Sequence, residues 1–201
     1  MRSLLLSITA ALSFSAAAYA APVVGEMAPD FTATDINGNE VTLSSLKEQN
    51  VVLEWHNPEC PFVKKFYKGG DMQKLQAEMK AKDLTWITIN SGAEGKQGSM
   101  NNEEAAAYLA EVKSATDHYI TDPEGTIGKL YGATATPHMY VIDKEGKLAY
   151  MGAIDDTPTA DSADIATANN YVRAAVEALS SNMPIQLATS QAYGCSVKYA
   201  N

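Results

Sequence analysis

Cys60 is the residue in this 201-residue chain whose surroundings most clearly suggest chemistry. It follows a run at 51–55 that is apolar except for Glu54, and Pro61 after it suits the first position of a helix, where a missing N–H costs nothing. A thiol at a helix N-terminus lies near unpaired backbone N–H groups that favour an anion, so its pKa falls and nucleophilic thiolate accumulates. The sequence therefore predicts that Cys60 is an ionised sulfur that reagents can reach.

Five side chains near Cys60 are candidates for tuning or shielding this thiol. Two are cations within about one helical turn of Cys60, two are imidazoles that the order of elements places nearby, and one is an indole that could exclude water. They are Lys64, Lys65, His56, His138 and Trp55. For the two histidines, the favoured interpretation is an ordinary one, as hydrogen-bonded, partly buried rings, with a role as base or thiolate-tuning group as the alternative.

Cys195 is the other cysteine of the chain, 135 positions after Cys60. Two cysteines in an oxidising compartment favour a Cys60–Cys195 disulfide. Closing so long a loop stabilises a fold by about 5 kcal/mol in the chain-entropy model. The bridge could therefore be a redox pair or a static brace, and the sequence leaves both open.

The first 20 residues are typical of a secretory signal peptide. Arg2 supplies the positive start, residues 4–14 are apolar, and Ala18-Tyr19-Ala20 forms a small-x-small cleavage site. We expect removal at about Ala20, which leaves a periplasmic or otherwise exported domain of residues 21–201. No later stretch approaches the roughly 20 apolar residues of a membrane helix, so we expect no membrane attachment after cleavage.

The charge of the chain disfavours two classes of partner. The formal net charge is −9, and it becomes −10 when Arg2 leaves with the signal peptide. An acidic surface repels phosphate backbones and anionic lipid, so we expect neither nucleic acid nor an anionic membrane as a partner.

Hydrophobic periodicity and turn signals predict alternating strands and helices. A hairpin around Asn37-Gly38 precedes the strand at 51–55, and a helix from Pro61 is interrupted at Gly69-Gly70 before a second segment N-capped by Asp71. The remaining strands are expected at 84–90, 119–121, 139–142 and 148–151, and the remaining helices at 101–112, 127–131 and 169–179. This order predicts an α/β sandwich, with a mixed sheet covered by helices on both faces.

Thr136-Pro137 stands directly before the strand expected at 139–142. Proline is tolerated at the first residue of a strand, and a turn of this kind favours a cis peptide bond. Such a turn presents the backbone of the preceding residue as an edge with which an extended substrate segment could pair.

Together these pieces resemble the thioredoxin superfamily, and within it the AhpC/TSA, peroxiredoxin-like redoxins. The resemblance rests on Ala28-Pro29-Asp30-Phe31, Cys60-Pro61-Phe62-Val63, Thr136-Pro137 and Gly194-Cys195-Ser196. It implies a thioredoxin-like three-layer sandwich with an N-terminal hairpin extension, Cys60 as the attacking thiol, and Pro137 as a cis-proline beside it. It implies no bound organic cofactor. The implied partners are a redox-active protein, a small thiol or a peroxide, with an external thiol reductant.

Two departures from these families matter. Val63 stands where a thioredoxin has its second cysteine, and neither Leu53 nor Asn57 matches the peroxidatic motif of a peroxiredoxin. Peroxidase activity is therefore not carried over. Cys195 is expected to take the missing role, by resolving the mixed disulfide or sulfenic acid formed at Cys60.

Two other functions use the same residues. Cys60, Cys195 and a histidine could bind a soft metal such as Cu(I), or the fold could be a non-catalytic binding module with a permanent disulfide.

Four aspartates lie close together in the sequence, but they do not have the spacing of an EF-hand calcium loop. We predict that they belong to a solvated loop. They are Asp155, Asp156, Asp161 and Asp164.

Overall fold

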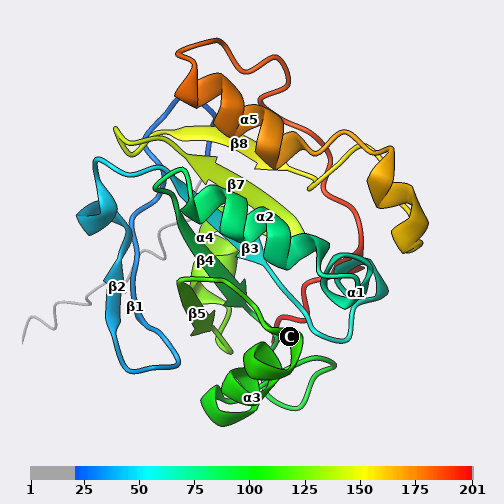
Figure 1. The fold of residues 1–201 in the computed structure, drawn as a ribbon. Helices are drawn as coiled ribbons and strands as arrows, with labels where there is room; N and C mark the ends of the chain where they lie inside the picture. The colour runs from blue at the N-terminus through cyan, green and yellow to red at the C-terminus, as the bar shows by residue number, and fades with distance from the viewer. Residues whose placement is uncertain (1–20, 201) are drawn as a thin grey trace, which may run out of the picture.

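The computed structural model describes residues 21–200 and places a five-stranded mixed sheet at the centre of the molecule (Figure 1). The strand order is β5 (His118–Thr121), β4 (Thr85–Asn90), β3 (Val51–Trp55), β7 (His138–Ile142) and β8 (Leu148–Gly152). β3 pairs in parallel with β4 and antiparallel with β7. Because β3 is buried on both faces, its run of large apolar residues matches a central strand.

Successive side chains of β3 point into two different cores. Val51, Leu53 and Trp55 belong to one cluster of buried residues, whereas Val52 belongs to the other. This alternation is the period-two geometry of a strand. It separates Trp55 from Cys60, which lies in the cluster with Val52.

Helices cover both faces of the sheet. The face that includes Cys60 packs against α1 (Pro61–Lys68), α2 (Asp71–Lys80) and α5 (Tyr171–Ser180). The opposite face packs against α4 (Thr126–Tyr131) and the N-terminal hairpin of β1 (Thr32–Thr34) and β2 (Glu40–Thr42). The three-layer sandwich and its hairpin extension are thus confirmed.

The remaining elements are short or peripheral. α3 (Asn102–Val112) begins with the predicted capping box, in which Asn101 and Glu104 bond reciprocally. The 3₁₀ turns η1 (Leu43–Leu46) and η2 (Ser162–Ala166) lie in connecting segments. β6 (Ala135–Thr136) and β9 (Cys195–Ser196) form a two-stranded pair that joins the C-terminal segment to the rest of the fold.

The start of α2 differs from the prediction. Asp71 is the first helical residue and Gly70 is the N-cap, in the left-handed region at φ 83°. Glycine adopts this conformation without a Cβ clash, so the chain turns there, and Asp71 adds a favourable negative charge to the first helical turn.

The predicted signal peptide at 1–20 lies outside the described residues. Between residues 21 and 200, no helix is both long and apolar enough to cross a membrane.

A buried carboxylate lies behind the helices on the Cys60 side of the sheet. Glu54 accepts hydrogen bonds from the Tyr67 hydroxyl at 2.9 and 3.0 Å, the Trp86 indole at 3.0 Å and the Thr88 hydroxyl at 3.2 Å. Gln76 in turn donates to the Tyr67 oxygen at 3.3 Å. Burial raises the pKa of Glu54 to about 7, although these donors oppose the shift.

This raised pKa makes stability depend on pH in a defined direction. Glu54 binds its proton more tightly in the folded chain than at its ordinary value of 4.5, so folding is most favourable below that value. The contribution is lost as pH rises through about 7. Linkage gives a total loss of about 3 kcal/mol.

We expect Glu54→Gln to flatten this pH dependence, since glutamine copies the neutral acid and its amide can donate to Tyr67. Urea unfolding between pH 5 and 8 measures the effect, and Glu124→Gln at an exposed position is the matched control. A variant that keeps the slope of the natural chain would show that Glu54 does not carry it.

Candidate active site at Cys60 and Cys195

Cys60 is the N-cap residue of α1, and Pro61 occupies the first helical turn as predicted. The Cys60 carbonyl accepts hydrogen bonds from the backbone N–H groups of Val63 at 3.0 Å and Lys64 at 2.9 Å. Upstream, the Asn57 side chain accepts from the Glu59 N–H at 2.9 Å and so shapes the loop between β3 and α1. The sulfur is therefore set at the amino end of the helix, where backbone donors converge.

The Thr136–Pro137 turn lies against this sulfur. The peptide bond between these residues is cis, as predicted. The Cys60 thiol donates to the Thr136 carbonyl at 3.1 Å. The turn is thus in direct contact with Cys60.

Cys195 reaches the same place from the C-terminal segment, which Figure 1 shows running from α5 past α1. β9 pairs antiparallel with β6, and Cys195 stands opposite Thr136. The Cys195 N–H lies 3.4 Å from the Cys60 sulfur, and both thiols are free. Gly194 has φ 120°, and a Cβ there would collide with the Thr136 carbonyl, so only glycine allows this approach.

The surroundings of the two thiols shift their pKa values in opposite directions. Burial by itself would raise the pKa of Cys60, but hydrogen bonds from the side chains of Cys195 and Thr136 and from the backbone N–H groups of Cys195 and Val63 outweigh it and bring that pKa below its ordinary value. Burial raises the pKa of Cys195 to about 11, and the adjacent Cys60 adds to the rise. Cys60 is therefore the more readily ionised sulfur of the pair.

The two candidate cations do not point at the thiols. Lys65 is buried; its ammonium lies 3.6 Å from the Asp155 carboxylate and donates to the Thr157 carbonyl at 2.9 Å. Lys64 is exposed. The prediction that Asp155 belongs to a solvated acidic loop is wrong, because this residue is buried against Lys65.

The two histidines bond to groups other than the thiols. The His56 ring lies between the hydroxyls of Tyr119 at 3.0 Å and Tyr108 at 3.2 Å. The His138 ring accepts from the Thr134 N–H at 3.4 Å and lies 3.3 Å from the Tyr140 hydroxyl. Burial lowers the pKa of His56 to about 3 and that of His138 to about 4, so both are neutral at pH 7 and carry no charge toward Cys60.

Trp55 does not shield Cys60, because its side chain points to the opposite face of the sheet. Its indole donates to the Ser91 hydroxyl at 3.0 Å and packs against Tyr131 and Tyr140. Phe62, which packs against the Tyr193 ring at 5.8 Å between centroids, lies on the Cys60 side instead.

The prediction of a reachable Cys60 sulfur is wrong for this conformation. Cys60 is 0% exposed, whereas Cys195 is partly exposed. The sulfur is covered by the C-terminal segment together with the buried apolar residues of α1. Sequence reasoning anticipated that the segment folds back, but not that it would close the site.

The copper alternative places a histidine beside the two sulfurs. Within residues 21–200, no three His, Cys, Asp or Glu side chains gather in a metal-binding arrangement. The imidazoles closest in sequence to the site, His56 and His138, have the partners given above. The described residues therefore bring no histidine to the two sulfurs to complete the proposed copper site.

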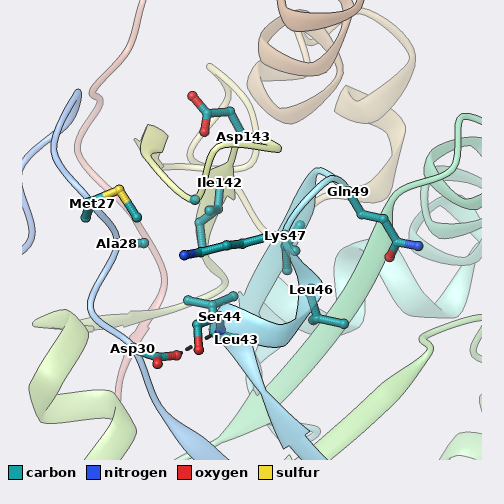
Figure 2. A pocket seen from close by; sticks show the side chains of 12 residues that line it. Met27, Ala28, Asp30, Leu43, Ser44, Leu46, Lys47, Gln49, Ile142 and Asp143 are labelled. Atoms are coloured by element: carbon teal, nitrogen blue, oxygen red, sulfur yellow. Dashed lines mark hydrogen bonds between the residues drawn. The ribbon is translucent and has the colours of Figure 1, made fainter.

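A separate hollow of about 260 Å³ lies elsewhere in the molecule (Figure 2). Met27, Leu43 and Lys47 line it, together with Val51 at the start of β3 and Ile142 at the end of β7. Cys60 follows the other end of β3, so this hollow lies at the opposite end of the sheet and takes no part in the thiol site.

Two curated proteins are similar to part of the chain. The chain is 24% identical over 131 residues to the methylamine utilization protein MauD of Paracoccus versutus, covering 65% of this chain and 59% of that protein. It is 25% identical over 125 residues to the thiol-disulfide oxidoreductase ResA of Bacillus thuringiensis, covering 62% and 66%. The chain thus spans less than two thirds of the length of these relatives.

The fold is similar to solved structures along most of the chain. An uncharacterised conserved protein from Geobacillus kaustophilus superposes with a TM-score of 0.74 and 26% identity, covering 89% of this chain and 93% of that one. A putative thiol:disulfide interchange protein DsbE from Chlorobium tepidum superposes with a TM-score of 0.52 and 26% identity, covering 65% of this chain and 85% of that one. Together with the sheet order and the cis-proline turn, this likeness defines a thioredoxin-like architecture.

The AhpC/TSA family model matches residues 24–151, from the segment before the hairpin through Cys60 and Pro137 to the last strand of the sheet. Since this match covers more than half of the chain, the protein belongs to the AhpC/TSA family.

Proposed function

We propose that this chain is an exported thiol–disulfide oxidoreductase that cycles between two free thiols and a Cys60–Cys195 disulfide. The observation that carries the proposal is the pairing of a thiol of lowered pKa with a second cysteine whose N–H lies 3.4 Å from its sulfur. The similarity of the chain to the thiol-disulfide oxidoreductase ResA supports the same chemistry. The signal-like residues 1–20 support export, and an exported location is where such a disulfide persists.

The oxidative half of the cycle begins at Cys60. Its thiolate attacks one sulfur of a substrate disulfide; a mixed disulfide forms and the other substrate sulfur leaves as a thiolate. Cys195 loses its proton and attacks the Cys60 sulfur, which expels the second substrate thiolate and closes the Cys60–Cys195 bond. Two electrons pass from the protein thiols to the substrate. Because Cys60 is buried, this half requires the C-terminal segment to move aside.

A static brace is the second reading that the structure supports. The segment around Cys195 is bound through β9 and through side chains on either side, as a structural bridge would require. The reduction potential separates the two, since structural disulfides have potentials below about −300 mV.

We expect the oxidised protein to equilibrate with dithiothreitol buffers at a potential above about −300 mV, with both thiols released together. Thiol alkylation and mass spectrometry of the equilibrated samples measure the two states. Cys60→Ser and Cys195→Ser each remove the intramolecular bond and serve as controls. A disulfide that resists these buffers would identify a brace and contradict the cycle.

We expect Cys195→Ala to raise the pKa of Cys60, because the variant removes the side-chain hydrogen bond that favours its thiolate. Titration of thiolate ultraviolet absorbance measures the change in the variant, where Cys60 is the remaining cysteine. Cys195→Ser is the matched control, since its hydroxyl can still donate and should keep the pKa lower than alanine does. Equal pKa values in the two variants would show that Cys195 does not tune Cys60.

A further inference from the structure

The backbone edge beside Pro137 is already occupied by the chain itself. β9 pairs with β6, the Val197 N–H donates to the Thr134 carbonyl at 3.2 Å, and the Thr136 hydroxyl donates to the Cys195 carbonyl at 3.3 Å. An extended partner segment would need these same backbone groups. No partner can therefore pair at this edge while β9 is in place.

Two tyrosines fasten the segment on either side of Cys195. Before it, the Tyr193 hydroxyl donates to the Asp155 carboxylate, and its ring packs edge-on against Phe62. After it, the Tyr199 hydroxyl donates to the Ala133 carbonyl at 2.8 Å. Cys195 is thus held between two attachment points.

The position of the Tyr199 ring depends on two glycines at the start of α4. A Cβ at Gly125 or at Gly128 would collide with the Tyr199 ring. The N-terminal part of α4 is therefore shaped to admit this ring, and the segment is docked at a formed site.

Access to the two sulfurs in the disulfide is unequal. A thiolate attacks a disulfide sulfur from the side opposite the sulfur that leaves, and access decides which sulfur is attacked. Cys60 is fully buried in the core that includes Val63 and Phe66, whereas Cys195 packs against the edge of that core as a partly buried residue. Cys195 is partly exposed, and Gly194 and Ser196 beside it are exposed. Solvent thus reaches the pair from the Cys195 side.

We propose that a partner thiol attacks the Cys195 sulfur rather than the Cys60 sulfur, and that Tyr193 and Tyr199 are positioning residues that hold the C-terminal segment so that Cys60 stays covered. The inference rests on the proposed function and concerns its reductive half. A partner thiolate attacks the Cys195 sulfur, a partner–Cys195 disulfide forms, and the electron pair of the broken bond leaves on Cys60 as thiolate. A second partner thiol, after losing its proton, then attacks the partner's own bonded sulfur. Cys195 leaves with the electron pair and takes up a proton, so the partner dithiol is oxidised and the protein pair reduced.

The acidities of the two thiols favour the same direction. A disulfide releases the sulfur of lower thiol pKa faster. Burial raises the pKa of Cys195 to about 11, whereas the backbone N–H groups of Cys195 and Val63, which remain when Cys195 is in a disulfide, favour the Cys60 thiolate, so Cys60 is the better leaving group.

The test is to locate the first adduct. Oxidised full-length protein is mixed briefly with excess glutathione, quenched with a large excess of N-ethylmaleimide at neutral pH, and mapped by peptide mass spectrometry. We expect glutathione on Cys195 and maleimide on Cys60. Glutathione found mainly on Cys60 would overturn the inference while leaving the proposed function intact. A Cys60–Cys195 disulfide that never forms, or that excess thiol never opens, would overturn both.

Variants of the anchors test the positioning role. Tyr199→Ala should lower the ratio of glutathione bound to Cys195 to glutathione bound to Cys60 at least about tenfold. The variant loosens the C-terminal segment, which exposes Cys60 and lowers the effective concentration of Cys195 beside it. Tyr199→Phe keeps the ring between the glycines and should stay nearer the natural ratio. Tyr193→Ala is the second variant if Tyr199→Ala does not fold. Because unfolding would also expose Cys60, the ratio is compared only among variants whose circular dichroism and unfolding midpoint match a folded chain, and an unchanged ratio in these variants would overturn the assignment.

Discussion

The antiparallel pairing of β9 with β6 is the interaction on which the thiol site depends. It connects residue 195 to residue 136 and so brings a second cysteine to a sulfur that the helix end alone would leave unpaired. Two short strands contribute few hydrogen bonds of their own, and an isolated pair of this kind is marginal in water. The side-chain anchors of Tyr193 and Tyr199 therefore matter as much as the strand pairing itself.

The electrostatics of the site come from backbone and sulfur rather than from cations. Lys65 was the obvious candidate for stabilising a thiolate, yet its charge is taken up by Asp155, to which Tyr193 also donates. This cluster instead joins α1 to the segment that carries Cys195. A group that sequence spacing suggests for chemistry serves here to hold the fold at the site.

Two features that lie close in sequence separate because a strand alternates its faces. Trp55 and Glu54 are neighbours, but the indole packs against Tyr131 and Tyr140 while the carboxylate lies beneath α1 and α2. Sequence proximity to Cys60 thus gave the wrong surroundings for Trp55. It also gave no warning that Glu54, six residues before Cys60, is buried with four hydrogen bonds and a raised pKa.

The sequence by itself determined the order of strands and helices, the thiol at the start of α1, and the cis turn at Pro137. Each depends on local chemistry: apolar periodicity, Pro61 at a helix start, and a proline at a strand entrance. It also predicted that Cys195 meets Cys60, but not the pairing of β9 with β6 that brings the two together. Only the tertiary structure decided that the C-terminal segment closes over Cys60, that His56 and His138 bond to tyrosines, and that Asp155 is buried beside Lys65. Those outcomes depend on contacts between residues far apart in the chain, whose partners no local pattern specifies.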